Sequence, residues 1–365
     1  MKLDEILRRR IERHFLGGER GVDVVEVAGR IGGLHAQVAS SAQAAADLRL
    51  GMATDQATAD LQPGAVADQA AAGGRPGAVA DLERALWSDR TLVRTWAARG
   101  TLHLLPAADL PFWVAAMSTR TRETTGSWLR YHGVTAAQMA DIIAAVPDVL
   151  GDVPMTREEL ADAVIAATRH EELRGPLTQG FGAILKPLAF RGLLCSGPPR
   201  GRNVTFVAPR AWFGDWEAVE TEAAIDRLAL AYLDAYGPAD FAEFARWFDL
   251  KPALARKSFA RLELEPVDGH GFLPAGAERP VGRDSVLLLP AFDPYVVGAL
   301  RLLDVISSGP RSAVSRPQGW ISPTLVVNGR IEGVWEEKNG APAVTPFRTL
   351  PAAVRRALPR EAAII

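Results

Sequence analysis

The first fifty residues show the spacing of apolar positions that is typical of amphipathic helices. In residues 3–16, five apolar side chains recur at helical intervals and fall on one face: Leu3, Ile6, Leu7, Ile11 and Phe15. A second helix is predicted over 22–34, where the apolar run ends at a pair of glycines that suit a helix C-cap. A third helix is predicted over 40–50, with Ser40 or Ser41 as its N-cap.

Residues 51–80 interrupt this pattern. The segment is rich in alanine, glycine, glutamine and aspartate, contains no aromatic residue, and holds the hexapeptide PGAVAD twice, at 63–68 and 76–81. Because it has little apolar surface to bury, we expect a flexible insert. Two copies of a hexapeptide are too few to indicate a solenoid.

Beyond the insert, one order of elements recurs, in which helices are followed by a β-hairpin. The first occurrence comprises a helix over 80–88 and two apolar runs at 92–96 and 101–105. The second comprises a helix over 155–170, with Thr156 and Glu159 in capping-box spacing, a helical stretch over 177–194 and a hairpin over 193–209. The third comprises helical stretches over 223–237, 238–250 and 251–264 and strands over 262–269 and 270–274. This order is typical of winged-helix domains.

The end of the chain is richer in strand. Residues 284–298 and 323–337 are apolar and β-branched, and Asn328-Gly329 between two strand-like runs indicates a hairpin. A final helix is predicted over 350–362. We therefore predict an α+β fold, mainly α, of tandem winged-helix domains (helix-turn-helix plus β-hairpin) with a β-rich C-terminal part. The predicted domains are 1–130, which carries the insert at 51–80, then 131–215, 216–278 and 279–365.

Composition narrows the classes of function. The formal net charge of −2 over 365 residues excludes a polycation but permits a local basic face. The single cysteine, Cys195, excludes a disulfide within the chain and a cysteine-based zinc site. The histidines lack metal-binding spacing, and neither a GxGxxG turn after a strand nor a Walker lysine loop occurs, so we expect no metal and no nucleotide cofactor. With no secretory signal and no long apolar stretch, we expect a cytoplasmic protein without a membrane span.

Four stretches together resemble one family: GLHAQ, LVRTWAARGTLHLLP, LLPAFDPYVVG and ISPTLVVNGRIEGVW. They are similar to the bacterial winged-helix DNA glycosylases of the AlkZ and YcaQ type, and the resemblance runs from residue 3 to about residue 350, outside the insert. It implies three tandem winged helices and a β-rich C-terminal part that form a C-shaped body around double-stranded DNA. It also implies a monofunctional DNA glycosylase, a hydrolase of N-glycosyl bonds, which we expect to be a monomer without cofactors.

The family's catalytic signature is a glutamine, an apolar residue, and then a glutamine or aspartate. Here these positions are occupied by His35, Ala36 and Gln37. This histidine variant resembles the branch found beside gene clusters for DNA-alkylating natural products. A purine alkylated at N7 is already cationic, so its release needs mainly a placed water and a stabilised sugar. We predict that Gln37 positions the water and that His35, with an ordinary pKa near 6.5, polarises or deprotonates it, although the roles could be exchanged. The alternative is two structural residues at a helix end.

Several further residues are candidates for contact with DNA. Arginine forks suit phosphate, and the arginines of ILRRRIER belong to this class. The other candidates for nucleic-acid binding are Arg94, Trp96, Arg99, Arg200, Arg202, Arg301, Arg311, Arg316, Asn328 and Arg330. The hairpin at Asn328-Gly329-Arg330 is expected to enter a groove, as the resemblance implies. Candidate pocket residues are Ser40, Ser41, His103 and Asp293, where His103 could instead face solvent and Asp293 could only start a turn.

The leading hypothesis is a DNA repair or self-resistance enzyme that removes N7-alkylated purines, including bulky natural-product guanine adducts or crosslinks. Such an adduct requires an open cleft at His35, with the damaged nucleotide kept in the duplex. One alternative is a non-catalytic winged-helix regulator that binds DNA. A third hypothesis is a small-molecule hydrolase that uses His35, for which the sequence offers no apparent nucleophile.

Overall fold

The computed structural model of the chain describes residues 1–51, 76–180, 182–278, 284–359 and 363–364. Its first winged unit contains, in chain order, α2 (Val24–Arg30), β1 (Leu34–His35), α3 (Ala39–Leu50), α4 (Pro76–Glu83), β2 (Leu92–Trp96) and β3 (Leu102–Pro106). A single π-helical turn, Arg84–Ser88, extends α4. The strands form an antiparallel sheet in the order β1-β3-β2, so the strand that carries His35 is an edge strand.

Two further units repeat this order. The second contains α7 (Ala136–Val149), β4 (Met155–Thr156), α8 (Arg157–Thr168), α9 (Arg174–Thr178), α10 (Lys186–Phe190), β5 (Cys195–Arg200) and β6 (Asn203–Val207), with sheet order β4-β6-β5. The third contains α12 (Thr221–Tyr236), α13 (Phe241–Phe248), α14 (Pro252–Arg261), β7 (Leu264–Val267) and β8 (Gly271–Pro274). Here a single bridge between Ala239 and Phe272 replaces the first strand. Connecting helices are α5 (Leu110–Met117), α6 (Gly126–His132) and α11 (Pro209–Phe213).

The C-terminal part is built on one sheet, in the order β13-β12-β11-β10-β9. Its strands are β9 (Val286–Leu289), β10 (Thr324–Val327), β11 (Arg330–Lys338), β12 (Ala341–Pro346) and β13 (Ala363–Ile364). Its helices are α15 (Pro294–Gly298), α16 (Leu303–Ile306), α17 (Arg311–Val314) and α18 (Ala352–Ala357). The N-terminal helix α1 (Leu3–Arg13) completes this core, because Leu7 and Ile11 join the same buried cluster as Leu289 and Tyr295.

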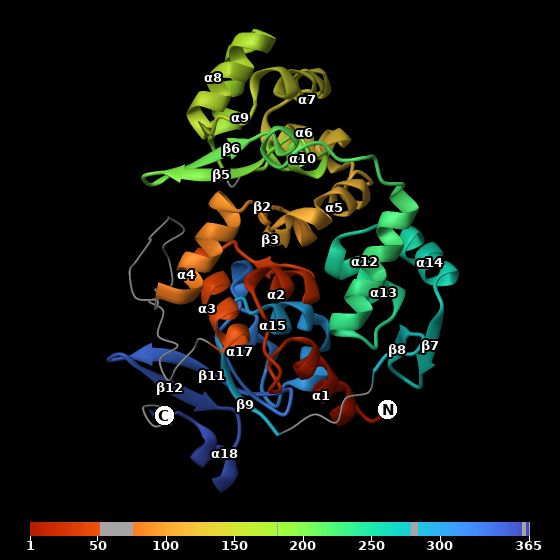
Figure 1. Cartoon of the computed structure of the whole chain (residues 1–365), viewed down its shortest axis with the longest axis vertical. Coiled ribbons are helices and arrows are strands. Elements are labelled where there is room, and N and C mark those ends of the chain that lie inside the picture. The colour runs from red at the N-terminus through yellow and green to blue at the C-terminus, as the bar shows by residue number, and fades with distance from the viewer. Residues whose placement is uncertain (52–75, 181, 279–283, 360–362, 365) are drawn as a thin grey trace.

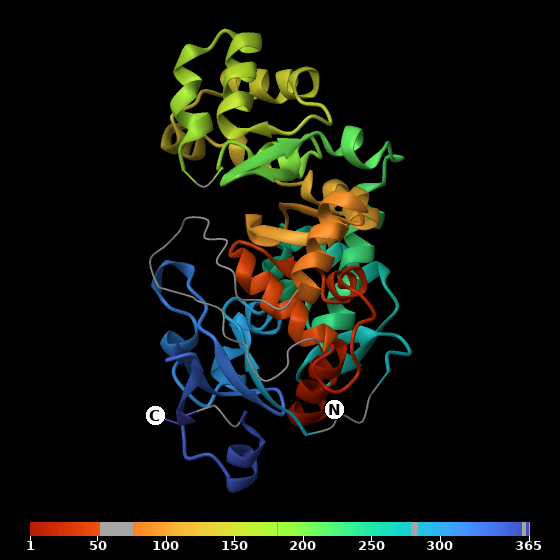
Figure 2. The same ribbon diagram turned by 60° about the vertical axis from the view of Figure 1, so that its left-hand side comes forward.

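The units are arranged around the first one. Figures 1 and 2 show the second unit as a lobe at the top of the molecule, with the first unit below it. In Figure 1 the third unit lies at the right, and the C-terminal sheet lies at the lower left. Strand β2 of the first unit contacts β5 of the second. Among the helices of the described ranges, none has the length and apolar character needed to cross a membrane.

The structure corrects several details of the sequence prediction. Helix α3 begins at Ala39 with Val38 as its N-cap, so neither serine caps it. The helical stretch predicted over 177–194 is divided between α9 and α10 by left-handed glycines. Residues 294–298 form a helix instead of a strand, because Asp293 caps it and Pro294 suits its first turn.

The structure also bears on the predicted capping box, the repeated hexapeptide and the predicted domain bounds. The capping box of Thr156 and Glu159 is confirmed at the start of α8. The second PGAVAD copy, at 76–81, lies entirely in α4, so the flexible insert expected over 51–80 is wrong for residues 76–80, whereas the first copy is outside the described residues. The predicted domain 1–130 includes α1, which packs in the C-terminal core. The division into four domains and the C-shaped outline stay predictions.

Candidate active site

Successive side chains of strand β1 point to opposite faces of its sheet. Leu34 and Ala36 belong to the buried core of the first unit. His35 points to the opposite face, where it is paired across the strands with His103. The backbone N–H of Ala36 donates to Leu102 O at 2.8 Å, so the extended backbone continues to this point. Alternation along this extended segment places His35 and Gln37 on the same side of the strand.

The imidazole of His35 is almost fully enclosed, with an exposed fraction of 5%. It stacks on Phe292, with ring centroids 5.2 Å apart and an interplanar angle of 3°, and meets His103 edge-on at 5.4 Å. Its Nδ1 is buried and has no hydrogen-bond partner among the described residues. Burial, and then the nearby Arg99, lowers the pKa of His35 to about 3. The expectation of a pKa near 6.5 is therefore wrong, and this histidine is neutral at physiological pH.

His103 is also buried and neutral, so the alternative that it faces solvent is wrong. Burial is the main cause that lowers its pKa, followed by His35. Its Nδ1 lies 2.9 Å from the carbonyl oxygen of Thr101. Because a carbonyl can only accept, Nδ1 must donate, which leaves the lone pair of His103 on Nε2.

Gln37, in contrast, is exposed at the end of this segment. Its Oε1 accepts a hydrogen bond from the backbone N–H of Leu102 at 3.3 Å. This contact uses the carbonyl end of the amide and leaves the Nε2 hydrogens as donors. The pair thus offers a buried acceptor ring at His35 and an exposed amide donor at Gln37.

A cavity of about 10 Å³ adjoins His35, which is room for about one water molecule. Gly33 forms part of its wall with φ +102°, and a Cβ there would lie 2.7 Å from Leu105 Cδ2. Only glycine fits this close approach without displacing a neighbour. The expected open cleft at His35 is not present, because this cavity cannot admit a purine.

Asp293 holds the C-terminal part against this site. Its two carboxylate oxygens accept hydrogen bonds from Arg49 at 2.8 and 2.9 Å, and both side chains are fully buried. Oδ1 of Asp293 also accepts from the N–H of Tyr295 at the start of α15. The preceding residue, Phe292, has a φ of +57°, a strained conformation that coincides with its stacking on His35. Asp293 therefore starts a turn and anchors it, as one of its two interpretations predicted.

The remaining candidate pocket residues are less informative. The Oγ of Ser41 is buried and has no hydrogen-bond partner among the described residues. Ser40 is half-buried, and the structure connects neither serine with His35. No group of three potential metal ligands occurs in the part of the chain that the structure describes.

Many of the arginines predicted to bind DNA already have partners in the protein. Arg94 and Arg99 donate to the carbonyl oxygens of Ala36 and Trp247, at 3.4 and 2.8 Å. Three others form ion pairs, namely Arg200 with Glu159, Arg311 with Asp304 and Arg330 with Asp4.

Two predicted contacts are buried inside the protein. Trp96 is buried and stacks with Phe206, so its prediction as a DNA contact is wrong. Arg9, from ILRRRIER, is also buried and donates to the backbone oxygens of Asp234 and Glu278.

The predicted Asn328-Gly329 hairpin exists, and its turn is partly buried. Gly329 is buried, and the hydroxyl of Tyr295 donates to its carbonyl oxygen at 2.7 Å. Asn328 uses its Oδ1 to accept from the N–H of Ser285 at 2.7 Å. Asn328 and Arg330 are half-buried, and the expectation that this turn enters a DNA groove stays a prediction. The exposed turn is the next one, Asn339-Gly340 between β11 and β12, which carries the same dipeptide signal and was missed.

A few predicted basic residues do remain available. Arg202, Arg301 and Arg316 are exposed and have no hydrogen-bond or ion-pair partner of their side chains among the described residues. Arg246, on α13, has the same properties but was missed, since nothing in its local sequence distinguishes it from a solvated helix face.

Three comparisons place these features beside known proteins. The family model described as DNA glycosylase AlkZ-like matches residues 28–364. A Streptomyces sahachiroi protein named "Interstrand DNA cross-link repair glycosylase" is 39% identical over 292 residues, covering 76% of this chain and 78% of that protein. The solved structure of the Streptomyces sahachiroi DNA glycosylase AlkZ matches with a TM-score of 0.84 and 33% identity, covering 100% of both chains.

Proposed function

The chain belongs to the AlkZ-like DNA glycosylase family, and we propose that it removes purines alkylated at N7 from double-stranded DNA, including bulky guanine adducts and crosslinks. The expected family, the α+β fold class and the glycosylase activity are thereby confirmed. The Streptomyces sahachiroi relative is named for repair of interstrand cross-links, which supports a substrate of this class.

The proposed mechanism uses the neutral state of His35. The bond between C1′ and the purine breaks with its electron pair moving to the base, which leaves as a neutral molecule because it carried a positive charge. Water adds to C1′ and loses a proton to solvent. His35 accepts a hydrogen bond from this water and so orients its lone pair toward the sugar. The amide N–H groups of Gln37 hold the nucleotide or the water from the exposed side.

The observation that carries this proposal is the water-sized cavity beside a neutral histidine, with the exposed Gln37 two residues further along the same extended segment. A cavity of about 10 Å³ has no room for an extruded purine and is not the open cleft expected for a bulky adduct, so the proposal keeps the damaged nucleotide in the duplex with its adduct outside this cavity. An N7-alkylated purine needs little protonation, which fits a site whose histidines are uncharged.

The test is base release from duplex oligonucleotides that contain a single 7-methylguanine or a bulky N7 adduct. Abasic sites are cleaved with alkali and quantified under single-turnover conditions. We expect His35→Ala and Gln37→Ala each to slow release at least about tenfold, with DNA binding retained. His270→Ala, in the β7–β8 turn, is the matched control and should keep the full rate. DNA binding without base release from any of these substrates would instead support the non-catalytic regulator.

A further inference from the structure

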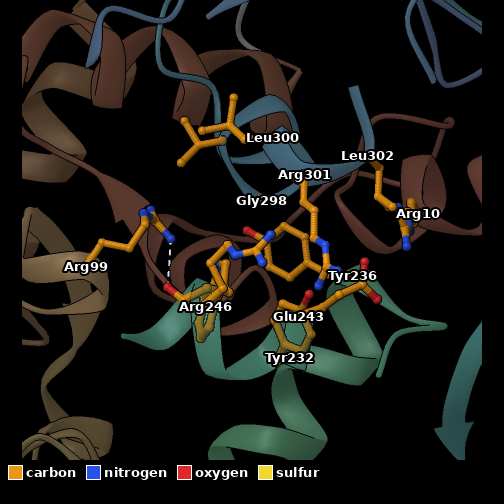
Figure 3. A pocket seen from close by; sticks show the side chains of 12 residues that line it. Arg10, Arg99, Tyr232, Tyr236, Glu243, Arg246, Gly298, Leu300, Arg301 and Leu302 are labelled. Atoms are coloured by element: carbon orange, nitrogen blue, oxygen red, sulfur yellow. Dashed lines mark hydrogen bonds between the residues drawn. The ribbon is translucent and has the colours of Figure 1, made fainter. Parts of the chain in front are cut away.

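A second cavity adjoins the water-sized cavity beside His35. Its volume is about 80 Å³, and it lies between α12 and α13 of the third unit, the β2–β3 turn and the segment after α15 (Figure 3). The two cavities share walls, among them Arg99, Tyr236 and Trp247. A group bound in the larger cavity therefore lies next to the candidate catalytic histidine.

The walls of this cavity combine aromatic and aliphatic side chains with charged ones, most of them arginines. The charged residues that border it are Arg10, Arg99, Arg246, Arg301 and Glu243. Glu243 already accepts a hydrogen bond from the N–H of Asp240 at 3.1 Å, as part of the capping box of α13. Four guanidinium groups against one engaged carboxylate create a site for an anion.

Arg10 forms part of this cavity and lacks a charged partner. Its exposed fraction is 7%, and its Nη2 donates to Pro238 O at 3.0 Å. Its Nε is buried without a hydrogen-bond partner, and no carboxylate pairs with it among the described residues. A buried guanidinium without a counter-ion is unfavourable, so an anion in the cavity would compensate it. The positive charges of Arg49 and Arg10 also act on buried His14. Burial is the main cause that lowers the pKa of His14, followed by these two arginines.

Arg246 and Arg301 form the accessible side of the cavity. Both are exposed and unpaired among the described residues, unlike Arg200 and Arg311, which have carboxylate partners. Figure 3 shows both side chains extending into the space between the helices of the third unit and the C-terminal segment. The cavity thus combines a buried arginine with two exposed arginine forks at its accessible side.

We propose that this cavity binds one phosphate of the DNA backbone beside the damaged nucleotide. The inference rests on the proposed function, since it assumes that His35 faces the sugar of that nucleotide. Guanidinium forks match phosphate oxygens, and a strand presents one phosphate roughly every 3.4 Å along the helix axis. A phosphate held here fixes the position of the neighbouring sugar relative to His35 without reading the base.

The experiment removes one phosphate charge at a time. Duplexes with a single 7-methylguanine carry one neutral methylphosphonate linkage, placed at successive positions around the lesion, and binding is measured by fluorescence anisotropy at fixed salt. For the wild type we expect one linkage beside the lesion to weaken binding about tenfold, the loss of one charge-assisted contact. Arg246→Ala and Arg301→Ala should bind the unmodified duplex about tenfold more weakly and lose their sensitivity to that linkage.

The control is Arg356→Ala, which removes one exposed arginine from α18, outside the cavity. It should keep the linkage-specific penalty of the wild type, and circular dichroism checks that all variants are folded. A flat scan in the wild type, or an undiminished penalty in both cavity variants, would overturn the proposal.

Two further readouts separate the remaining explanations. Calorimetric titration with inorganic phosphate, with and without duplex, tests for a free-anion site. If inorganic phosphate binds, if Arg301→Ala abolishes this binding, and if the duplex does not displace the phosphate, the proposal is wrong. Base release is followed in the same samples. A linkage-specific penalty without release of 7-methylguanine contradicts the proposed substrate but supports the phosphate site, whereas release with a flat scan contradicts only the phosphate site.

Discussion

The imidazole of His35 lies between the rings of His103 and Phe292, and its surroundings define its chemistry. Burial and Arg99 keep it uncharged, so one ring nitrogen can accept a hydrogen bond while the other keeps its N–H. Such a residue suits a reaction in which the leaving group already carries the charge. It would not suit the removal of an unmodified purine, which needs protonation to leave.

The rate of base release should therefore lack the pH dependence of an ordinary histidine. With a pKa of about 3, His35 is neutral from pH 5.5 to 8.5, and we expect no inflection near pH 6.5 that depends on it. Single-turnover rates on a 7-methylguanine duplex over this range measure the effect. An inflection near pH 6.5 in the wild type that disappears in His35→Ala would contradict the lowered pKa.

The sequence could predict the pair at 35 and 37 but not its surroundings. No strand was predicted at this position, so the face that His35 and Gln37 share through strand alternation is known only from the structure. One of the two rings that contact His35, the ring of Phe292, comes from a segment about 250 residues later and reaches it through a strained backbone angle. The ion pair of Arg200 with Glu159 likewise depends on tertiary contacts that a basic hairpin tip does not reveal.

At the scale of secondary-structure elements, the turns at Asn328-Gly329 and Asn339-Gly340 share a dipeptide but differ in what surrounds them. Gly329 and Gly340 both have positive φ, +83° and +77°. A Cβ at Gly329 would lie 2.6 Å from Leu7 Cβ, whereas nothing lies within 4 Å of a Cβ at Gly340. One turn is docked against α1, and the other projects into solvent.

This contrast gives a matched pair of substitutions. Gly340→Ala should cost about 1 kcal/mol in the free energy of unfolding, from the unfavourable φ alone. Gly329→Ala should cost about 3 kcal/mol, because overpacking against α1 adds to the same strain. Urea unfolding of both variants measures the difference. Equal losses would show that the first turn is not held against α1.

The ion pair of Arg49 with Asp293 joins α3 to the start of α15, and its loss should destabilise the fold. Arg49→Met leaves a buried carboxylate unpaired and should cost about 3–5 kcal/mol. Arg49→Met combined with Asp293→Asn should cost less than the sum of the single changes, since no unpaired charge then remains. Chemical denaturation of the four proteins completes the cycle. Strict additivity would argue against a direct interaction.

Elements within one unit were more predictable than connections between units. The capping box at Thr156 and the hairpin at β2 and β3 depend on neighbours in sequence, and both were predicted. The docking of the Asn328-Gly329 turn could not be predicted, because it depends on Tyr295 and α1, which lie in other elements.

At the scale of the whole molecule, buried histidines make stability depend on pH. The pKa values of His14, His35 and His103 are all lowered, mainly by burial. Each contributes stability that is present above the unfolded pKa of about 6.5 and is lost as pH falls, because only the unfolded state gains the proton. Asp47 opposes this between its unfolded value and its raised pKa of about 6.

We therefore expect the free energy of unfolding to be about 3 kcal/mol lower at pH 5.5 than at pH 7.5, from roughly one proton bound per histidine on unfolding. Urea denaturation at the two pH values measures this difference. The same stability at both would show that these imidazoles titrate normally in the folded protein.

The place of α1 has a consequence for how the chain is made. This helix leaves the ribosome well before its packing partners, because Leu7 and Ile11 pack in one cluster with Leu289 and Tyr295, more than 250 residues later. Until those residues are synthesised, the apolar face of α1 has no packing partner and must be shielded from other apolar surfaces. Only after synthesis of residues 287–331 can α1 pack into its core.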